Sequence, residues 1–136
     1  MDCIFCKIVR GEIPASKVYE DDDMLVILDV GPVHEGHCLI LPKDHHETLF
    51  ETPEPLMEKI GPLMKKTTIA VKKATGCDGV NIAQNNFKAA GQLVPHLHFH
   101  VIPRYEGDGL KTWPQGHYEE GKMQKVGEKI RENWVS

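Results

Sequence analysis

Short apolar runs bounded by glycine and proline occupy the first third of the chain and predict β-strands. The run Met24–Asp29 is almost wholly apolar and holds β-branched residues, which is typical of a buried strand, and Gly31-Pro32 breaks it. A second such run, Gly36–Pro42, follows at once, and a weaker one covers residues 16–21. The closeness of the two apolar runs favours an antiparallel meander.

A long helical pattern follows between Pro53 and Ala74. Its apolar residues recur at helical spacing on one face, whereas most of its lysines lie off that face. Gly61-Pro62 interrupts the pattern and is expected to kink or delay the helix, because proline lacks the amide proton that a helix interior needs. Gly76 is a natural C-terminal stop.

The remaining pattern completes an α+β arrangement. Residues 79–84 and 96–103 read as strands, with a polar loop at 85–92 between them. Strands, one long helix and further strands predict an antiparallel sheet with the helix packed on it. Shorter helical segments are expected at Cys3–Val9 and near Gln124–Glu132, the latter within a polar tail of about residues 105–136.

Composition is that of an ordinary globular protein and narrows the classes of partner. A length of 136 residues favours one domain over residues 1–136, and a formal net charge of −4 makes a nucleic acid a weak candidate. No apolar run reaches membrane-spanning length, and the N-terminal segment lacks a secretory pattern, so we expect no membrane partner and a cytoplasmic location. A reducing compartment disfavours disulfides among the four cysteines and favours metal or redox roles.

Three histidines alternate with apolar residues in the last predicted strand. His96, His98 and His100 share one face, because successive side chains of a strand point to opposite sides, and the intervening apolar side chains would face the core. A solvated polar face is the plain alternative. The outer two histidines are about 13 Å apart along an extended strand, so one metal ion cannot easily bind all three. The triplet therefore divides its roles.

The C-x-x-C spacing of Cys3 and Cys6 indicates where one histidine belongs. A structural zinc site takes four ligands, often two thiolates and two imidazoles. His45 and His96 are candidates for the second pair, and His46 is the obvious rival of His45. The alternative is that both cysteines are small buried side chains of the apolar core and bind no metal.

His98, the central histidine, is then the candidate nucleophile. A neutral imidazole attacks phosphorus, provided that one ring nitrogen is held as a donor so that the other carries the lone pair. The charge that develops on the phosphate needs donors. His100 on the same face, with Asn85 and Gln92 from the preceding segment, has the right chemical type.

The chain resembles the histidine triad family. The run from His96 to Ile102 is similar to the signature H-φ-H-φ-H-φ-φ, in which φ is apolar, and residues 4–22, 28–49 and 79–105 look like the opening, middle and end of compact Hint-type members. The resemblance implies a HIT-like α+β fold and a homodimer whose two sheets join. It also implies a purine nucleotide ligand and attack on its α-phosphorus. The bonds cut would be phosphoramidates, acyl-adenylates or polyphosphates, through a covalent nucleotidyl-histidine.

The resemblance also assigns roles by position. His98 matches the nucleophile, His100 the α-phosphate contact and His37 a histidine that positions the nucleophile. Asp29 matches the acid that binds ribose hydroxyls, and Asn85 and Gln92 match polar residues near the phosphate and leaving group. The apolar walls around the base correspond to Phe5, Ile8, Ile27 and Val30. Members with C-x-x-C bind structural zinc through residues that match Cys3, Cys6, His45 and His96.

Two features differ from the family pattern. Leu93 stands where many Hint-type members carry a hydroxyl that helps to protonate a departing amine. Because leucine lacks this hydroxyl, polyphosphates remain an alternative to phosphoramidates as substrates. Residues 112–116 resemble a Trp-Pro tail that reaches the partner's active site, but about twenty residues follow here.

Two alternative functions remain. The protein could be a purine-nucleotide-binding interaction protein with incidental turnover, or a small zinc-binding module. We expect His34, His46 and His117 to lie on the surface.

Overall fold

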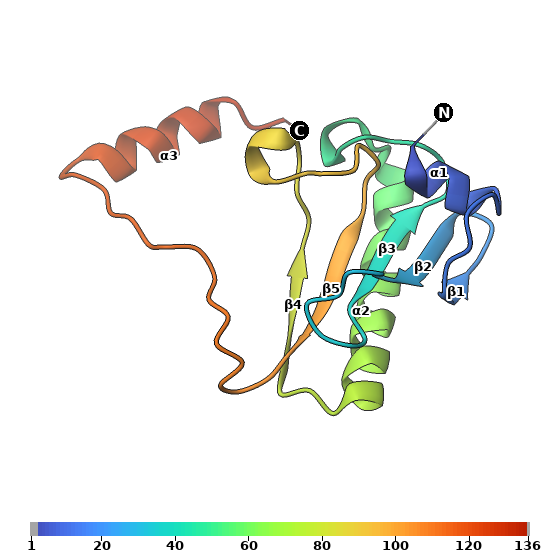
Figure 1. The fold of residues 1–136 in the computed structure, drawn as a ribbon. Helices are drawn as coiled ribbons and strands as arrows, with labels where there is room; N and C mark the ends of the chain where they lie inside the picture. The colour runs from blue at the N-terminus through green and yellow to red at the C-terminus, as the bar shows by residue number, and fades with distance from the viewer. Residues whose placement is uncertain (1–2, 136) are drawn as a thin grey trace.

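The computed structural model describes residues 3–135, and a five-stranded antiparallel sheet organises them in the order β1-β2-β3-β5-β4 (Figure 1). The strands are β1 (Lys17–Glu20), β2 (Met24–Leu28), β3 (Cys38–Pro42), β4 (Gly79–Ala83) and β5 (Phe99–Arg104). β2 and β3 form the predicted meander, with Val26 opposite Ile40. The predicted α+β class is confirmed.

Helix α2 (Glu54–Thr75) covers one face of the sheet. Ile60, Leu63 and Val71 pack against buried side chains of β2, β3 and β5 and form the larger core. In β5 the buried positions alternate, so Phe99 and Val101 point toward the helix. The side chain of His100 therefore lies on the opposite face of the sheet.

Helix α1 (Ile4–Val9) covers part of that opposite face. Its Phe5 and Ile8 form a second core with apolar side chains of β2 and β3, namely Leu25, Ile27, Leu39 and Leu41. Both central strands are thus covered on both faces. This double burial explains why their sequences read as continuous apolar runs rather than alternating ones.

The long helix begins at Glu54 and runs without a break through Pro62, so the delay expected at Gly61-Pro62 is wrong, and the kink stays a prediction. Pro62 is exposed, whereas Ile60 and Leu63 on either side are buried against the sheet. The helix loses one backbone hydrogen bond at the proline, but tertiary packing of the neighbouring turn holds it together. Gly76 ends the helix with φ 68°, as expected.

The strand predicted over residues 96–103 begins only at Phe99. Before it, the amide of Leu97 donates to the carbonyl oxygen of His46 at 2.6 Å, outside the sheet. Two short 3-10 helices also occur, Leu49–Glu51 and Lys88–Ala90, the second inside the predicted loop. His96 and His98 consequently lie on an irregular segment, where their rings take different surroundings.

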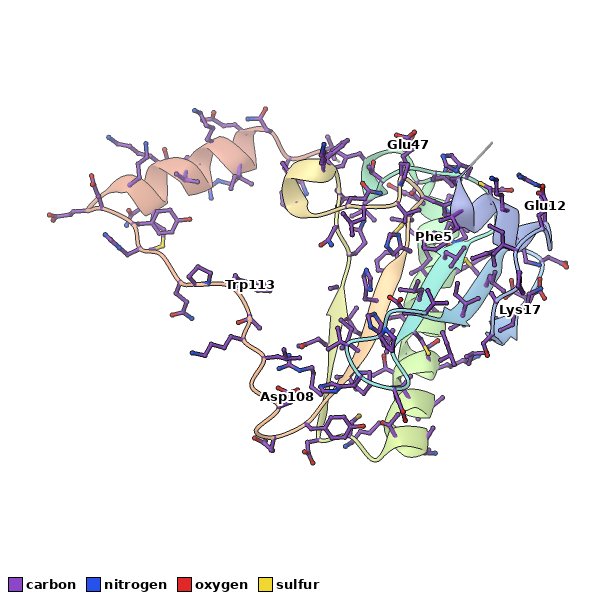
Figure 2. The ribbon with its side chains drawn as sticks, viewed as in Figure 1. Phe5, Glu12, Lys17, Glu47, Asp108 and Trp113 are labelled. Atoms are coloured by element: carbon purple, nitrogen blue, oxygen red, sulfur yellow. The ribbon has the colours of Figure 1, made fainter. Side chains whose placement is uncertain are left out.

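The chain after β5 leaves the sheet as an extended arm and ends in α3 (Lys122–Glu132), close to the predicted helix (Figure 1). Trp113 lies on this arm, away from the sheet, and is 81% exposed (Figure 2). The role of this Trp-Pro segment stays a prediction. Among the described residues, every helix is too short or too polar to cross a membrane.

Candidate active site

Two histidines and an aspartate meet on the sheet face opposite α2. His37 precedes β3 and His100 lies in β5, and the pairing of these strands brings His37 Nε2 within 2.9 Å of His100 Nδ1. Asp29, which follows β2, places its Oδ2 3.6 Å from His37 Nε2. Gly36, just before His37, lets this loop pack on the end of α2, because its φ of 97° disfavours other residues and a Cβ there would lie 2.6 Å from Thr75 Cγ2.

Hydrogen bonds fix the tautomers of this pair. The amide of Val33 donates to His37 Nδ1 at 3.1 Å, so the proton of the neutral His37 ring is on Nε2. His37 Nε2 can then donate to His100 Nδ1. His100 in turn carries its own proton on Nε2, which makes that atom a donor toward the space beside the sheet.

His98 has the opposite tautomer. Its Nδ1 donates to the carbonyl oxygen of His96 at 2.7 Å, which leaves the lone pair on Nε2. The ring packs edge-on against Phe5, with centroids 5.0 Å apart, and against His100 at the same separation. These contacts hold the orientation of the ring that a nucleophile at Nε2 requires.

Burial keeps these rings neutral. Desolvation lowers the pKa of His98, although the carbonyl of His96 opposes this effect. Desolvation, followed by the neighbouring His98 and His37, lowers the pKa of His100 to about 4. Burial also lowers the pKa of His37 against the opposing charge of Asp29. At neutral pH, the lone pair of His98 is therefore available.

A cavity of about 550 Å³ opens beside these rings. One end is polar and contains His98, His100, Asp29 and Asn85. The rest is mostly apolar, with walls from α1, the segment after it, and β2 and β3, including Phe5, Ile8, Ile27, Val30 and Leu39. The volume and the mixture of an apolar slot with a few convergent polar groups are typical of a small-molecule site.

The structure brings most of the sequence-predicted site residues to this cavity, but His37 lies buried behind His100 and Gln92 lies elsewhere. The Gln92 Nε2 donates to the carbonyl oxygens of Glu47 and Val94, at 2.6 and 3.1 Å, and its Oε1 accepts from the amide of Phe87. The amide group is therefore occupied by backbone and lies outside the cavity lining. Val30, in contrast, lines the rim although its side chain is fully exposed.

A second cluster lies beside the first and joins Cys3, Cys6, His45 and His96. The four Sγ–Nδ1 separations are between 3.2 and 3.5 Å. Tetrahedral zinc with ordinary bond lengths separates sulfur and nitrogen ligands by about 3.5 Å, so the donor set fits this metal. His45, not His46, points into the cluster, so His96 lies in this cluster whereas His98 and His100 line the cavity.

The surroundings of the cluster favour the binding of a cation. His96 Nε2 donates to the carbonyl oxygen of Pro42 at 2.8 Å, which leaves Nδ1 free as a ligand. Burial, and then Cys3, raises the pKa of the Cys6 thiol to about 11. A divalent cation would supply the positive charge that two neighbouring thiolates, one of them buried, need.

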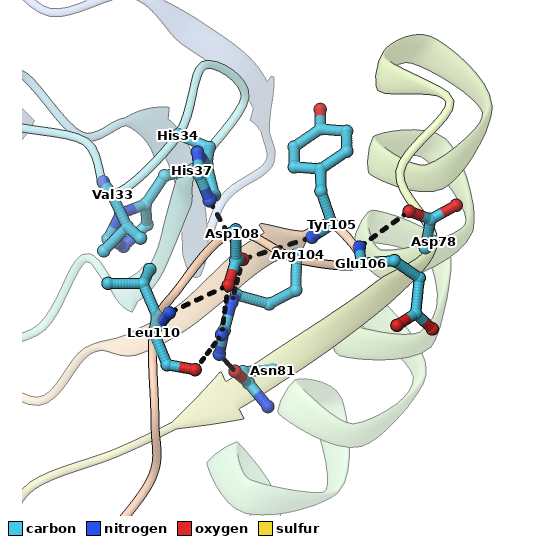
Figure 3. Close-up of polar contacts among 10 residues, drawn as sticks. All are labelled: Val33, His34, His37, Asp78, Asn81, Arg104, Tyr105, Glu106, Asp108 and Leu110. Carbon is cyan, nitrogen blue, oxygen red and sulfur yellow. Dashed lines mark hydrogen bonds and ion pairs between the residues drawn. The ribbon is translucent and has the colours of Figure 1, made fainter.

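A polar network outside the cavity supports the segment that carries His37 (Figure 3). Asp108 accepts from Arg104 Nε at 2.7 Å, and its Oδ2 lies 3.2 Å from His34 Nε2. The pKa of Asp108 is held far below its usual range, first by Arg104. The ring of His34 also packs edge-on against Tyr105. His34 is therefore half-buried and held by partners, whereas the sequence led us to expect a surface residue, because no local pattern marks a partner 74 positions away.

The sequence profile of the HIT domain family matches residues 10–107. The chain belongs to this family. Among curated relatives, it is 41% identical over 132 residues to the adenosine 5'-monophosphoramidase of Schizosaccharomyces pombe, with 96% of each chain covered. It is 50% identical over 109 residues to an adenylylsulfatase of Arabidopsis thaliana, covering 80% of this chain and 55% of that protein.

Solved structures of the HIT family superpose on most or all of this chain. A HIT family protein from Bacillus subtilis is 37% identical, with a TM-score of 0.92 over 100% of this chain and 99% of that one. A zinc-bound histidine triad family protein from Mycobacterium smegmatis is also 37% identical, with a TM-score of 0.77 over 98% and 97%. The arm and α3 lie within the segment that the Bacillus subtilis structure covers.

Proposed function

We propose that this HIT protein is a nucleotide hydrolase or transferase acting on the α-phosphorus of purine nucleotide conjugates, with His98 as nucleophile. The single observation that carries the proposal is the hydrogen bond from His98 Nδ1 to the carbonyl oxygen of His96, beside a nucleotide-sized cavity. The bond leaves the Nε2 lone pair free. The names of two relatives, a phosphoramidase and an adenylylsulfatase, support hydrolysis of an adenosine phosphate conjugate.

The two ends of the cavity suit the two ends of a nucleotide. The purine would lie in the apolar slot between Phe5, Ile8 and Ile27. Asp29 Oδ1 accepts from the amide of Gly31 at 2.8 Å, which orients the carboxylate. Its remaining acceptor sites can take hydrogen bonds from two vicinal ribose hydroxyls. The α-phosphate then falls beside the histidines.

The reaction would proceed in two displacements. In the first, the Nε2 lone pair of His98 forms a bond to phosphorus, and the bond to the leaving group breaks. A departing amine leaves with the electron pair and takes a proton from solvent, whereas sulfate or a polyphosphate leaves as an anion. In the second, a water oxygen attacks phosphorus, the P–Nε2 bond breaks and AMP leaves. The water proton passes to solvent, so His98 returns to its neutral form.

His100 and Asn85 would stabilise the phosphate. The His100 Nε2–H faces the cavity as a neutral donor, because His37 occupies its Nδ1. A donor held in this manner lowers the energy of charge that develops on the phosphate oxygens. We assign Gln92 a supporting role through the loop rather than contact with substrate, since backbone groups occupy its amide.

Zinc would bind at Cys3, Cys6, His45 and His96 and would hold α1, residues 45–46 and the start of the triad segment together. Its role here is structural. Support comes from the donor geometry and from the zinc-bound relative. Since His96 would be a ligand and its carbonyl oxygen accepts from His98, the metal would also stabilise the backbone that orients the nucleophile.

We further propose that residues 1–136 form one HIT domain that pairs with a second copy. Strand β4 lies at the edge of the sheet and pairs only with β5 among the described residues, and Ile82 on it is half exposed. An unpaired edge with an exposed apolar residue is a natural site for strand pairing between subunits.

A substrate panel tests the function. Adenosine phosphoramidates, an adenylyl sulfate and dinucleoside polyphosphates should be compared by initial rate, with rapid mixing to record the first turnover. We expect AMP as the common product and saturable turnover of at least one class, with a burst of leaving group if release of the adduct is slower than its formation. Tight AMP binding without any turnover would instead favour the purine-nucleotide-binding protein.

A further inference from the structure

Phe87 has a backbone conformation that L-amino acids rarely adopt. Its φ is 72° and its ψ is 160°, and it is the one non-glycine residue with positive φ among residues 3–135. This region of backbone space is occupied almost entirely by glycine. A phenylalanine there costs folding free energy, so the position of the aromatic ring requires a reason.

The surrounding loop enforces this conformation. Gln92 Oε1 accepts from the amide of Phe87 at 2.7 Å, and the carbonyl oxygen of Phe87 accepts from the amides of Ala90 and Gln92, both at 3.1 Å. Gln92 also donates to the carbonyl oxygen of Glu47, which fastens the loop to the segment before η1 (Leu49–Glu51). The backbone that carries the ring is thereby held in place.

The ring is presented to solvent together with a second aromatic side chain. Phe87 is 55% exposed and Phe50 is 80% exposed, and their centroids are 5.3 Å apart. Phe87 borders a groove of about 440 Å³, which is further lined by Glu47, Thr48, Lys88, Gln92, Leu93 and Pro95. Aromatic rings presented at a groove bind flat apolar groups well.

The groove adjoins the candidate active site, with Leu93 between the two. Leu93, which is 93% exposed, lines both this groove and the nucleotide cavity. On the cavity side, Leu93 lies in the same lining as Asn85, His98 and His100, the polar end where the phosphate would bind. A group attached to the α-phosphorus would therefore extend over Leu93 toward the two rings.

We propose that Phe50, Phe87 and Leu93 form a subsite for an aromatic leaving group, so that the preferred substrates are AMP conjugates with a ring attached near the phosphorus. This subsite rests on the proposed function. The ring itself does not react. The bond to phosphorus breaks as described above, and contact with the ring adds binding energy that contributes to kcat/KM.

A matched pair of substrates isolates the ring. The phenethylamine and ethylamine phosphoramidates of AMP share the same P–N linkage and differ by one phenyl group. We expect wild-type kcat/KM to be at least about tenfold higher for the phenethylamine conjugate, and the ratio to fall about tenfold in Phe87→Gly, which corresponds to roughly 1.4 kcal/mol. Glycine accepts the positive φ, so this variant keeps the loop.

Two further variants sharpen the comparison. Phe50→Ser should lower the same ratio, while Tyr19→Ser, which removes an exposed aromatic ring from the opposite edge strand, should leave the ratio at its wild-type value. A wild-type ratio near one, or a ratio that neither Phe variant changes, overturns the subsite while the proposed function stands. Altered sedimentation of the Phe87→Gly variant would assign the patch to contact between copies and would also overturn it.

Binding separates failure of the subsite from failure of the function. In His98→Ala, where turnover is absent, the phenethylamine conjugate should still bind more tightly than the ethylamine conjugate, and adding Phe87→Gly should abolish the difference. If wild type hydrolyses neither conjugate but this preference persists, the subsite holds and the proposed hydrolysis fails. Equal affinities of the two conjugates in His98→Ala contradict the subsite.

Discussion

The ring of His98 is held by the backbone of His96, through a hydrogen bond of 2.7 Å from Nδ1 to the carbonyl oxygen. His96 belongs to the cluster that fits zinc, and His98 lies in the cavity lining. One peptide segment thus links the candidate metal site to the candidate nucleophile. Changes at either site should affect the other to a degree that can be measured.

Loss of the cysteines should remove the metal and lower stability. Cys3→Ser or Cys6→Ser is expected to lower Tm by roughly 10 °C or more, because metal binding at such a site contributes several kcal/mol of folding free energy. Elemental analysis should find about one zinc per chain in the wild type and far less in the variants. Cys77→Ala is the control, since Cys77 is buried outside the cluster. Unchanged melting of the wild type after chelation would refute the structural role.

His34 and Asp108 should act on catalysis from outside the cavity. They anchor the segment whose Val33 amide fixes the tautomer of His37. We expect His34→Ala to lower kcat about tenfold while KM changes little, since a displaced His37 weakens the transition state more than nucleotide binding. His34→Asn, which retains a donor for Asp108, should restore part of kcat.

The control for this network is His117→Ala, in the arm, which should leave kcat unchanged. Equal losses of kcat in His34→Ala and His34→Asn, or a change confined to KM, would exclude a positioning role. A fall in Tm alone, with kcat preserved, would make the network merely structural.

The fold, and most of the residues that gather at the candidate site, were predictable from the sequence. Apolar periodicity predicted the sheet and the long helix, and the alternation around His98 predicted which side chains face α2. Other contacts distant in the sequence could not be predicted. The pairing of His34 with Asp108 and the occupation of Gln92 by backbone carbonyls arise only from tertiary structure. The continuity of α2 through Pro62 was missed because tertiary packing outweighs local propensity.

Stability should depend on pH through His100. Its pKa is about 4 in the folded protein and 6.5 in the unfolded chain. Between these values the unfolded state binds more protons, so stability is complete above about pH 6.5 and is lost as pH falls toward 4. Because the ring is partly exposed and thus screened, we expect about 1 kcal/mol from this residue.

His100→Gln should therefore flatten the dependence of unfolding free energy on pH in that window. Denaturant unfolding at several pH values measures the effect. His117→Gln, on the arm, should reproduce the wild-type curve. Loss of metal in acid would affect both variants equally, so it does not explain a difference between their curves. Parallel curves for wild type and His100→Gln would show that His100 does not titrate as the structure predicts.

The most direct measurement of the central claim is the site of covalent attachment. The protein should be mixed with an adenosine phosphoramidate, quenched within the first turnover and examined by intact mass and peptide mapping under conditions that preserve phosphohistidine-type bonds. Attack by His98 predicts one AMP per chain on that residue, absent in His98→Ala, which should keep the wild-type fold. AMP attached to another residue, or full turnover in His98→Ala, would contradict the account.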